Sequence, residues 1–406
     1  MKKVWDKWTR IALVKRILVG LILGAILGIA VPQATGIAIL GDVFVSALKA
    51  IAPLLVFFLV ISSLCNAGKS HGGVIKTVII LYMFSTVLAA VIAVFASMAF
   101  PVKMTLANAA TDTSAPQGIV EVLNNLLLNV VANPVSSLVN ANYVGILMWA
   151  VLLGLAFRAA DKMTKKVLAD VADGISMVVT WIINLAPFGI FGLVFNTVST
   201  NGLDIFTTYG KLLLLLVGCM LFIYFVTNPL LVYWCIRQNP YPLIFQCLKR
   251  SALTAFFTRS SAANIPVNMK VCEEMGLDRD TYSVTIPLGA TINMDGAAIT
   301  ITVMTMATAF TLGIHVDIPT AIILSLLAAL SACGASGVAG GSLLLIPMAC
   351  SLFGISDDIS MQVVAVGFII GVVQDSVETA LNSSSDLLLS ASAEFRQWRL
   401  EEIKFK

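Results

Sequence analysis

Charged residues are scarce in this 406-residue chain: they make up 12% of it, whereas 59% of its residues are hydrophobic. An ordinary soluble protein carries about a quarter charged residues, so the composition excludes that class. The mean hydropathy of +0.96 and apolar runs that are continuous rather than alternating indicate an all-α, polytopic membrane protein and exclude a β-barrel. A net charge of +3 is too small to suggest a nucleic-acid partner.

Histidines and clustered cysteines are also lacking. The two histidines, His71 and His315, lie at the ends of apolar segments, so a histidine proton relay inside the membrane is not expected. The seven cysteines form no CxxC or Cys/His cluster, which argues against a disulfide framework and against a metal site of that type. Without such a cluster near Ser260 or Ser336, an intramembrane serine or metal hydrolase is disfavoured as well. We therefore expect a protein that is not an enzyme.

Long apolar runs occupy most of the chain, and each is long enough to be a membrane span or most of one. The expected spans are Ile17–Val31, Val43–Leu64, Thr77–Phe100, Val167–Val198, Tyr209–Ile236, Tyr282–Leu312 and Ile359–Leu389. Pro187 and Pro229 are expected to kink two of them, because proline removes a helix hydrogen bond and clashes with the preceding turn.

The region after the third span is irregular. Val102–Gly118 is polar and is expected to form a long external loop. The runs Val120–Val131 and Tyr143–Phe157 are each too short to span, and Asn133-Pro134 separates them. We interpret the two runs as one broken, peripheral span, which brings the expected total to eight.

The loops between the spans differ in charge. Lys and Arg collect in the N-terminal segment, Lys69–Lys76, Arg158–Lys166, Arg237–Arg250 and the C-terminal tail. The loops around Gly36, Asp112 and Asn201 carry almost none. By the positive-inside rule this alternation predicts that both termini are cytoplasmic. No cleavable signal peptide is evident at the start of the chain.

Two apolar segments in the C-terminal half have polar centres. Ser251–Met269 contains Arg, Ser, Asn and Pro at its centre and has basic residues on both flanks, so both of its ends are expected on one side. Ile318–Phe353 has a Gly- and Ser-rich centre, lacks basic flanks and is too short for two spans. We predict two re-entrant hairpins that enter from opposite sides, assigned with their connections to 237–280 and 316–356.

A single aspartate, Asp295, lies in the middle of the apolar run Tyr282–Leu312. A carboxylate at that depth is unfavourable by several kcal/mol unless something offsets it, which makes it a candidate functional residue. The neighbouring Asn293 and Gly296 can loosen the helix and free backbone carbonyls. Because carboxylate, amide and carbonyl oxygens are the ligands of hard cations, the stretch predicts a cation site.

The last span carries a polar face. It is formed by Asp375, Glu378, Thr379, Asn382 and Asp386. Their spacings of three, one, three and four residues place them on one side of a helix. Lipid would not tolerate such a face, so it is expected to line a cavity or a protein interface.

These features together favour a secondary transporter. Hairpin and span alternate twice with opposite orientation, and such inverted repeats indicate a substrate site at the bilayer midplane. The carboxylates outnumber Arg259 and call for cations or a substrate ammonium, whereas helix N-termini at the hairpin tips suit a substrate carboxylate. A zwitterionic amino acid carried with cations fits both conditions. An ion channel, the alternative, would need a continuous ring of filter groups.

At four motifs the sequence resembles the dicarboxylate/amino acid:cation symporters, the family that includes the glutamate transporters. The motifs are Arg259-Ser260-Ser261, the run PLGATINMDG at Pro287–Gly296, Gly337-Val338 and Asp375…Asn382…Asp386. The resemblance covers nearly the whole chain. It implies eight transmembrane helices, two re-entrant hairpins, inverted repeats, a homotrimer and an elevator-type movement of a transport domain against a scaffold.

The resemblance also implies domain boundaries. The scaffold lies in 1–236, which holds spans 1 to 6, although span 3 joins the transport domain. Span 7 with the NMDG sequence occupies 281–315, and span 8 with the cytoplasmic tail occupies 357–406. The membrane is expected to be the bacterial inner membrane.

Residue roles follow from the same resemblance. The implied substrate site consists of Arg259, Ser260, Ser261, Val338, Asp375, Glu378, Thr379 and Asn382. Within it, Asp375 and Thr379 hold the substrate ammonium, and Ser261 and Asn382 hold its α-carboxylate. The implied Na⁺ ligands are Tyr82, Ser85, Thr86, Gly289, Thr291, Asn293, Asp295, Asn382 and Asp386.

Two positions depart from relatives that carry acidic substrates. Glu378 and Ala297 stand where those relatives have Arg and Thr. A substrate side-chain carboxylate would lose both partners and meet a like charge, which disfavours glutamate, aspartate and C4-dicarboxylates. The resemblance thus implies Na⁺-coupled uptake of small neutral amino acids such as serine and threonine. H⁺- or Na⁺-coupled uptake of acidic substrates is the alternative. Glu378 is expected either to pair with Arg259 or to accept a substrate hydroxyl.

Overall fold

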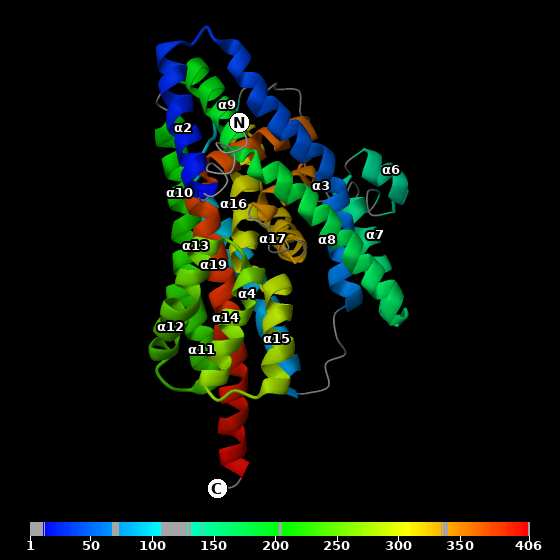
Figure 1. Ribbon diagram of the computed structural model, residues 1–406. Coiled ribbons are helices and arrows are strands. Elements are labelled where there is room, and N and C mark those ends of the chain that lie inside the picture. Colours follow the sequence, from blue (N-terminus) through cyan, green and yellow to red (C-terminus); the bar gives the residue numbers. More distant parts are fainter. Residues whose placement is uncertain are drawn as a thin grey trace.

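A computed structural model describes the chain except residues 1–10, 12, 67–72, 107–127, 129–130, 141, 203–204, 334, 336–339 and 405–406. The part that it describes is helical and contains no strand (Figure 1). Six helical stretches in it are long and apolar enough to cross a membrane: Thr35–Asn66, Gly73–Ala99, Lys162–Asn184, Thr207–Ile236, Arg279–Thr311 and Asp357–Glu401. The prediction of an all-α, multi-pass membrane protein is confirmed. Most of the predicted loop Val102–Gly118 and of the predicted short run Val120–Val131 lies outside the described residues.

One group of helices comes mainly from the N-terminal half. It comprises α2 (Leu13–Ala30), the short η1 (Thr35–Ala38), α3 (Ile39–Asn66), α6 (Pro134–Val139), α7 (Tyr143–Ala156), η2 (Phe157–Ala159), α8 (Lys162–Asn184) and α9 (Ala186–Asn201). Helix α2 packs along α9, and α3 contacts α7, α8 and α9. The predicted break at Asn133-Pro134 is confirmed, because the Asn133 side chain caps α6 and the proline occupies its first turn.

Three glycines on one face of α2 let this helix approach α9 closely. A Cβ added at Gly20 would lie 2.2 Å from the carbonyl oxygen of Pro187. At Gly24 it would lie 2.6 Å from the carbonyl oxygen of Phe191, and Gly28 is similarly close to α9. A spacing of four residues between small side chains is typical of closely packed membrane helices, because it lets the backbones meet. This pattern was not among the features predicted from the sequence.

A second group surrounds the long helix α19 (Asp357–Lys404), which runs through the middle of the molecule in Figure 1. Its other members include α4 (Gly73–Ala99), α10 (Ile205–Phe222), α11 (Asn228–Ile236), α15 (Arg279–Ile292) and α16 (Asp295–Thr311). Helix α19 contacts all five of them. Every residue of α16 from Asp295 to Ala309 is buried, so this helix lies in the interior of the group beside α19.

The two prolines predicted to disturb spans do so in different ways. Helix α8 ends at Asn184 and α9 begins at Ala186, so the single residue Leu185 separates them and Pro187 lies in the first turn of α9. Near Pro229 the chain forms the π-helical turn η3 (Ile223–Thr227) and then continues as α11. Both changes avoid the steric clash of the proline ring with the preceding turn, and neither leaves an α-helical hydrogen bond that the proline would have to donate.

The first polar segment forms two helical arms that contact each other. The leading arm consists of α12 (Tyr241–Cys247), the π-helical turn η4 (Leu248–Ala252) and α13 (Leu253–Thr258), and the returning arm is α14 (Ser261–Glu274). Arg259 joins the arms with a left-handed backbone (φ 53°). The Ser260 hydroxyl then accepts a hydrogen bond from the Ala263 amide (3.2 Å) and caps α14.

The second polar segment also consists of two arms in contact. They are α17 (Ile318–Ala332), capped by Asp317, and η5 (Gly341–Leu345) followed by α18 (Ile346–Ser351). Gly340 begins the second arm in the left-handed conformation (φ 74°), which glycine adopts without strain. The motif Gly337-Val338 lies outside the described residues.

The glycine contact between α2 and α9 gives a prediction about stability. Replacing Gly24 by Leu forces the two backbones apart, and overpacking of this kind lowers the free energy of unfolding by about 1–3 kcal/mol. Gly174→Leu on α8 is the matched control, because a Cβ there meets nothing within 4 Å. Thermal unfolding of the purified protein in detergent measures both. Equal melting temperatures for the two variants would contradict close packing at Gly24.

Candidate functional site

The NMDG sequence interrupts the helix that carries it. Helix α15 ends at Ile292 and α16 begins at Asp295. Between them Asn293 (φ −96°, ψ 80°) and Met294 (φ −119°, ψ 50°) leave the helical region. The prediction that this stretch loosens the helix is confirmed. Asp295 consequently lies in the first turn of α16, where the helix dipole favours a negative charge.

The carboxylate of Asp295 accepts hydrogen bonds from hydroxyl groups on α4. Ser85 Oγ donates to Asp295 Oδ2 (2.7 Å), and Thr86 Oγ1 lies 3.2 Å from Asp295 Oδ1. Thr86 Oγ1 also lies 2.9 Å from the carbonyl oxygen of Tyr82. All of these side chains are buried. The structure therefore brings the predicted residues Ser85, Thr86 and Asp295 together as a set of oxygen atoms of the kind that binds hard cations.

Tyr82 belongs to this group through its backbone, and its side chain lies elsewhere. The Tyr82 hydroxyl lies 2.9 Å from the carbonyl oxygen of Asp386 and 2.8 Å from Ser390 Oγ. Only its carbonyl oxygen approaches Thr86. A role of the Tyr82 hydroxyl beside Asp295 therefore has no support in this geometry.

Asp386 on α19 lies beside the interrupted helix. Asn293 Nδ2 donates to Asp386 Oδ1 (2.9 Å) and lies 3.4 Å from the carbonyl oxygen of Asn382. A Cβ added at Gly289 would lie 2.7 Å from Asp386 Oδ1, so α15 approaches the carboxylate with bare backbone. Asn293 Oδ1 is buried and accepts no hydrogen bond from any residue that the structure describes. Thr291 Oγ1 donates to the Leu288 carbonyl of its own helix (2.7 Å).

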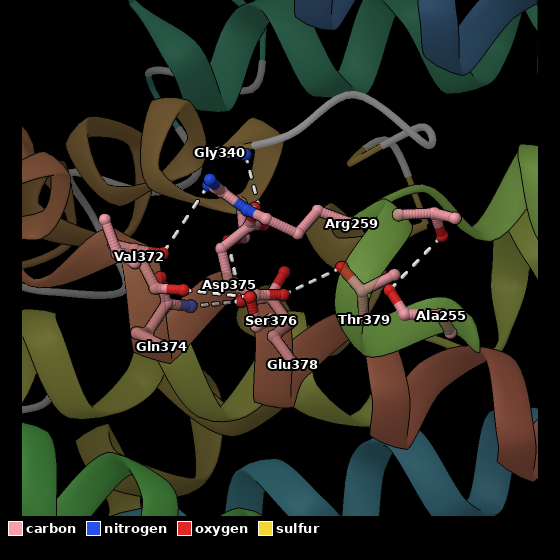
Figure 2. A network of polar contacts seen from close by, with 12 residues as sticks. Ala255, Arg259, Gly340, Val372, Gln374, Asp375, Ser376, Glu378 and Thr379 are labelled. Carbon is pink, nitrogen blue, oxygen red and sulfur yellow. Dashed lines mark hydrogen bonds and ion pairs between the residues drawn. The ribbon is translucent and has the colours of Figure 1, made fainter. Parts of the chain in front are cut away.

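Asp375 on α19 joins the turns of both polar segments (Figure 2). Arg259 Nε donates to Asp375 Oδ2 (2.6 Å), and the backbone amide of Gly340 donates to Asp375 Oδ1 (3.1 Å). The side chains of Arg259 and Asp375 are 10% and 4% exposed, so the ion pair is largely shielded from solvent. Both turns are thus fixed at one carboxylate by charge-assisted hydrogen bonds.

Glu378, one turn further along α19, has different partners. Its Oε2 accepts hydrogen bonds from Gln374 Nε2 (2.5 Å), Thr300 Oγ1 (2.7 Å) and Ser342 Oγ (2.9 Å). The predicted alternative in which Glu378 pairs with Arg259 is wrong, because the left-handed turn directs the guanidinium to Asp375. Gln374, Thr300 and Ser342 were not predicted. Gln374 lies four residues before Glu378, so helix spacing alone could have found it.

The remaining predicted substrate residues that the structure describes lie on α19 or at the start of α14. Asn382 Oδ1 accepts a hydrogen bond from the Gly296 amide (2.7 Å), and a Cβ at Gly296 would lie 2.9 Å from Glu378 Cγ. Thr379 Oγ1 donates to the Asp375 carbonyl (2.8 Å). Ser261 is buried near the start of α14. Val338, also predicted, lies outside the described residues.

An unpredicted amide network fastens the first polar segment to α19. Asn264 Nδ2 donates to Ser383 Oγ (2.8 Å), and Asn268 Nδ2 donates to the Ser383 carbonyl (2.8 Å). Ser251 Oγ in the leading arm donates to Asn268 Oδ1 (2.5 Å). Asn264 and Asn268 are four residues apart on α14, and this spacing was the available signal.

An all-helical membrane fold with buried carboxylates, hydroxyls and amides at broken helices defines a membrane transporter. The chain belongs to the sodium:dicarboxylate symporter family, whose model matches residues 13–394, and the predicted family is confirmed. It is 58% identical over 399 residues to the serine/threonine transporter SstT of Bifidobacterium adolescentis, covering 98% of this chain and 93% of that one. It is 55% identical over 400 residues to SstT of Streptococcus thermophilus, covering 98% and 100%.

The buried pair Arg259–Asp375 gives a prediction for a double-mutant cycle. Asp375→Asn leaves a guanidinium in a largely dry site without its counter-charge, and breaking a buried pair in this way costs about 3–5 kcal/mol. Adding Arg259→Gln should recover part of this loss, with a coupling energy of at least about 1 kcal/mol. Thermal unfolding in detergent, without substrate, provides the measurement.

The matched control is the ion pair between Arg250 and Glu274, whose side chains are 37% and 39% exposed. The same cycle there should give a coupling below about 1 kcal/mol, because water screens the charges. Equal coupling energies in the two cycles would show that the pair at Asp375 is no more shielded than a surface pair.

Proposed function

We propose that this protein is a secondary active symporter that imports serine and threonine together with Na⁺. The observation that carries the proposal is the match, over nearly the full length, to relatives named serine/threonine transporters at 55–58% identity. The site supports it independently. Glu378 and the apolar Ala297 are both buried and give a second substrate carboxylate no positive partner at these positions.

The substrate binds between the two polar segments and α19. Asp375 and Thr379 receive its ammonium group, helped by the carbonyls of Arg259 and Val338. For this the ammonium takes the place of Arg259 Nε at Asp375 Oδ2, since both are cationic donors. Asn382 and Ser261, beside Ser260 at the start of α14, receive the α-carboxylate at a helix N-terminus.

Na⁺ is carried at the buried oxygen atoms around Asp295 and Asp386. Neither carboxylate has an ion-pair partner within the described part of the chain, so a monovalent cation offsets a charge that is otherwise costly to bury. Asp295 acts with Ser85, Thr86, Asn293 and the Tyr82 carbonyl. For Asp386 the further ligands are the carbonyls of Gly289, Asn293 and Asn382, and Thr291 belongs to a third site. The buried, unpartnered Asn293 Oδ1 fits a cation ligand.

The transport cycle is an elevator movement of one helix group against the other. Helices α4, α15, α16 and α19 and the two polar segments form the moving unit, and α2, α3 and α7 to α9 form the scaffold. We include α10 and α11 in the moving unit because both pack along α19. The polar segments are re-entrant hairpins in a chain of eight spans, which assembles as a homotrimer in the bacterial inner membrane with both termini cytoplasmic.

Uptake of acidic amino acids or C4-dicarboxylates with H⁺ or Na⁺ is the second candidate, because the family name includes dicarboxylates. Glu378 argues against it, since its buried carboxylate already accepts three hydrogen bonds and would face a second anion. Uptake of labelled serine and labelled aspartate into proteoliposomes, with Na⁺ and pH gradients varied separately, distinguishes the two. An ion channel would instead give conductance without saturable, gradient-driven uptake.

The proposed cation sites predict a change in sodium dependence. In Asp295→Asn and in Asp386→Asn, the Na⁺ concentration for half-maximal serine uptake should rise at least about tenfold, because a charged ligand is lost from a buried site. Proteoliposomes at constant pH with graded external Na⁺ provide the measurement. Asp173→Asn on the exposed surface of α8 is the control. Unaltered sodium dependence in both site variants would refute the assignment.

A second prediction concerns the substrate hydroxyl. We propose that Glu378 accepts it at Oε1, because Oε2 already has three donors. Glu378→Gln should therefore raise the KM for serine about tenfold relative to the inhibition constant of alanine, which lacks the hydroxyl. Ser376→Ala is the control, since that hydroxyl donates to its own helix (2.9 Å). An unchanged ratio of serine to alanine affinity would argue against this role.

A further inference from the structure

A cavity with a volume of about 600 Å³ lies far along α19 from Asp375. It lies between the start of α12, Met275 at the end of α14 and the last turns of α19. Its walls combine the apolar side chains of Ile236, Leu243 and Phe395 with the amides of Gln238 and Gln246. The proposed transport mechanism uses none of these residues.

Arg399 gives the cavity its charge. The side chain lines the cavity, and its Nε atom is buried without a hydrogen-bond partner in the part of the chain that the structure describes. No carboxylate is among the described residues that line the cavity. A guanidinium without a counter-ion in a partly dry site attracts an anion, and its planar donors suit phosphate oxygens.

Exposed aromatic side chains surround this end of the molecule. Trp234, Tyr241 and Trp398 are 51%, 43% and 41% exposed, and the guanidinium of Arg396 lies 5.5 Å from the centre of the Trp234 ring. In membrane proteins Trp and Tyr are enriched where the hydrocarbon meets the headgroups. The aromatic side chains therefore indicate that the cavity lies at headgroup depth, and its lining combines apolar side chains with the guanidinium of Arg399.

We propose that this cavity binds an anionic phospholipid, with the phosphate on Arg399 and the acyl chains along the apolar wall. A basic pocket between helices at the membrane surface is the type of site that takes anionic headgroups. The bound lipid contacts both α12, which leads to Arg259, and the end of α19, which carries Asp375. It braces these two elements against each other from outside the substrate site.

The test uses the full-length protein, purified in detergent and exchanged into mixtures of phosphatidylglycerol and phosphatidylcholine, with bound lipid counted by native mass spectrometry. The wild type should retain phosphatidylglycerol at least about tenfold over phosphatidylcholine. Arg399→Gln should reduce this preference to within about twofold. Arg279→Gln removes an exposed cation at the same end of the molecule, outside the cavity, and should leave the preference unchanged.

A further variant keeps the charge and fills the space. Gln246→Trp should lower retention of both lipids while Arg399 remains, and Arg399→Lys should restore part of the preference lost in Arg399→Gln. Equal retention of the two lipids by the wild type would overturn the proposal, whatever the variants do. So would an equal loss of preference in Arg399→Gln and Arg279→Gln, because the effect would then be general surface charge. Serine uptake plays no part in this test, so its failure and a failure of the proposed transport are distinguishable.

Discussion

The burial of four carboxylates in a membrane interior is the constraint on which the rest of this structure depends. A charge is too costly there unless donors or cations surround it. Asp375 and Glu378 take donors from the turns and arms of the two polar segments, namely Arg259, Gly340 and Ser342. Glu378 has two further donors, Thr300 on α16 and Gln374 on α19 itself. Asp295 takes its donors from α4. The carboxylates thus fix where α4 and both polar segments pack.

Two glycines make this convergence possible. An added Cβ would lie within 3 Å of Asp386 at Gly289 and of Glu378 at Gly296, so at these two points α15 and α16 approach α19 with backbone alone. Because the chain between them leaves the helix at Asn293, the amide side chain of this residue reaches Asp386. The atoms that we propose as cation ligands are therefore also atoms at which α15, α16 and α19 pack together.

Much of the fold was predictable from hydropathy and proline positions, since lipid contact imposes continuous apolar runs and proline interrupts helices wherever it falls. The polar face of α19 and the loosened NMDG stretch were also predictable, because each depends on spacing within one helix. The partner of Arg259 was not predictable in this way. The sequence offered Glu378 as a possible partner, whereas in the structure Arg259 pairs with Asp375. The Tyr82 side chain likewise lies beside Asp386, although its backbone lies by Thr86.

The sequence by itself determined the class of protein, its family and the residue types that can bind cations and an amino acid. These follow from composition and from short motifs that each lie within one segment of the chain. Only the tertiary structure decided which donor meets which carboxylate. Such pairs join residues such as Ser85 and Asp295, which are 210 positions apart. Their contact depends on the rotation and depth of each helix in the bundle, and these are set by packing across the whole interior.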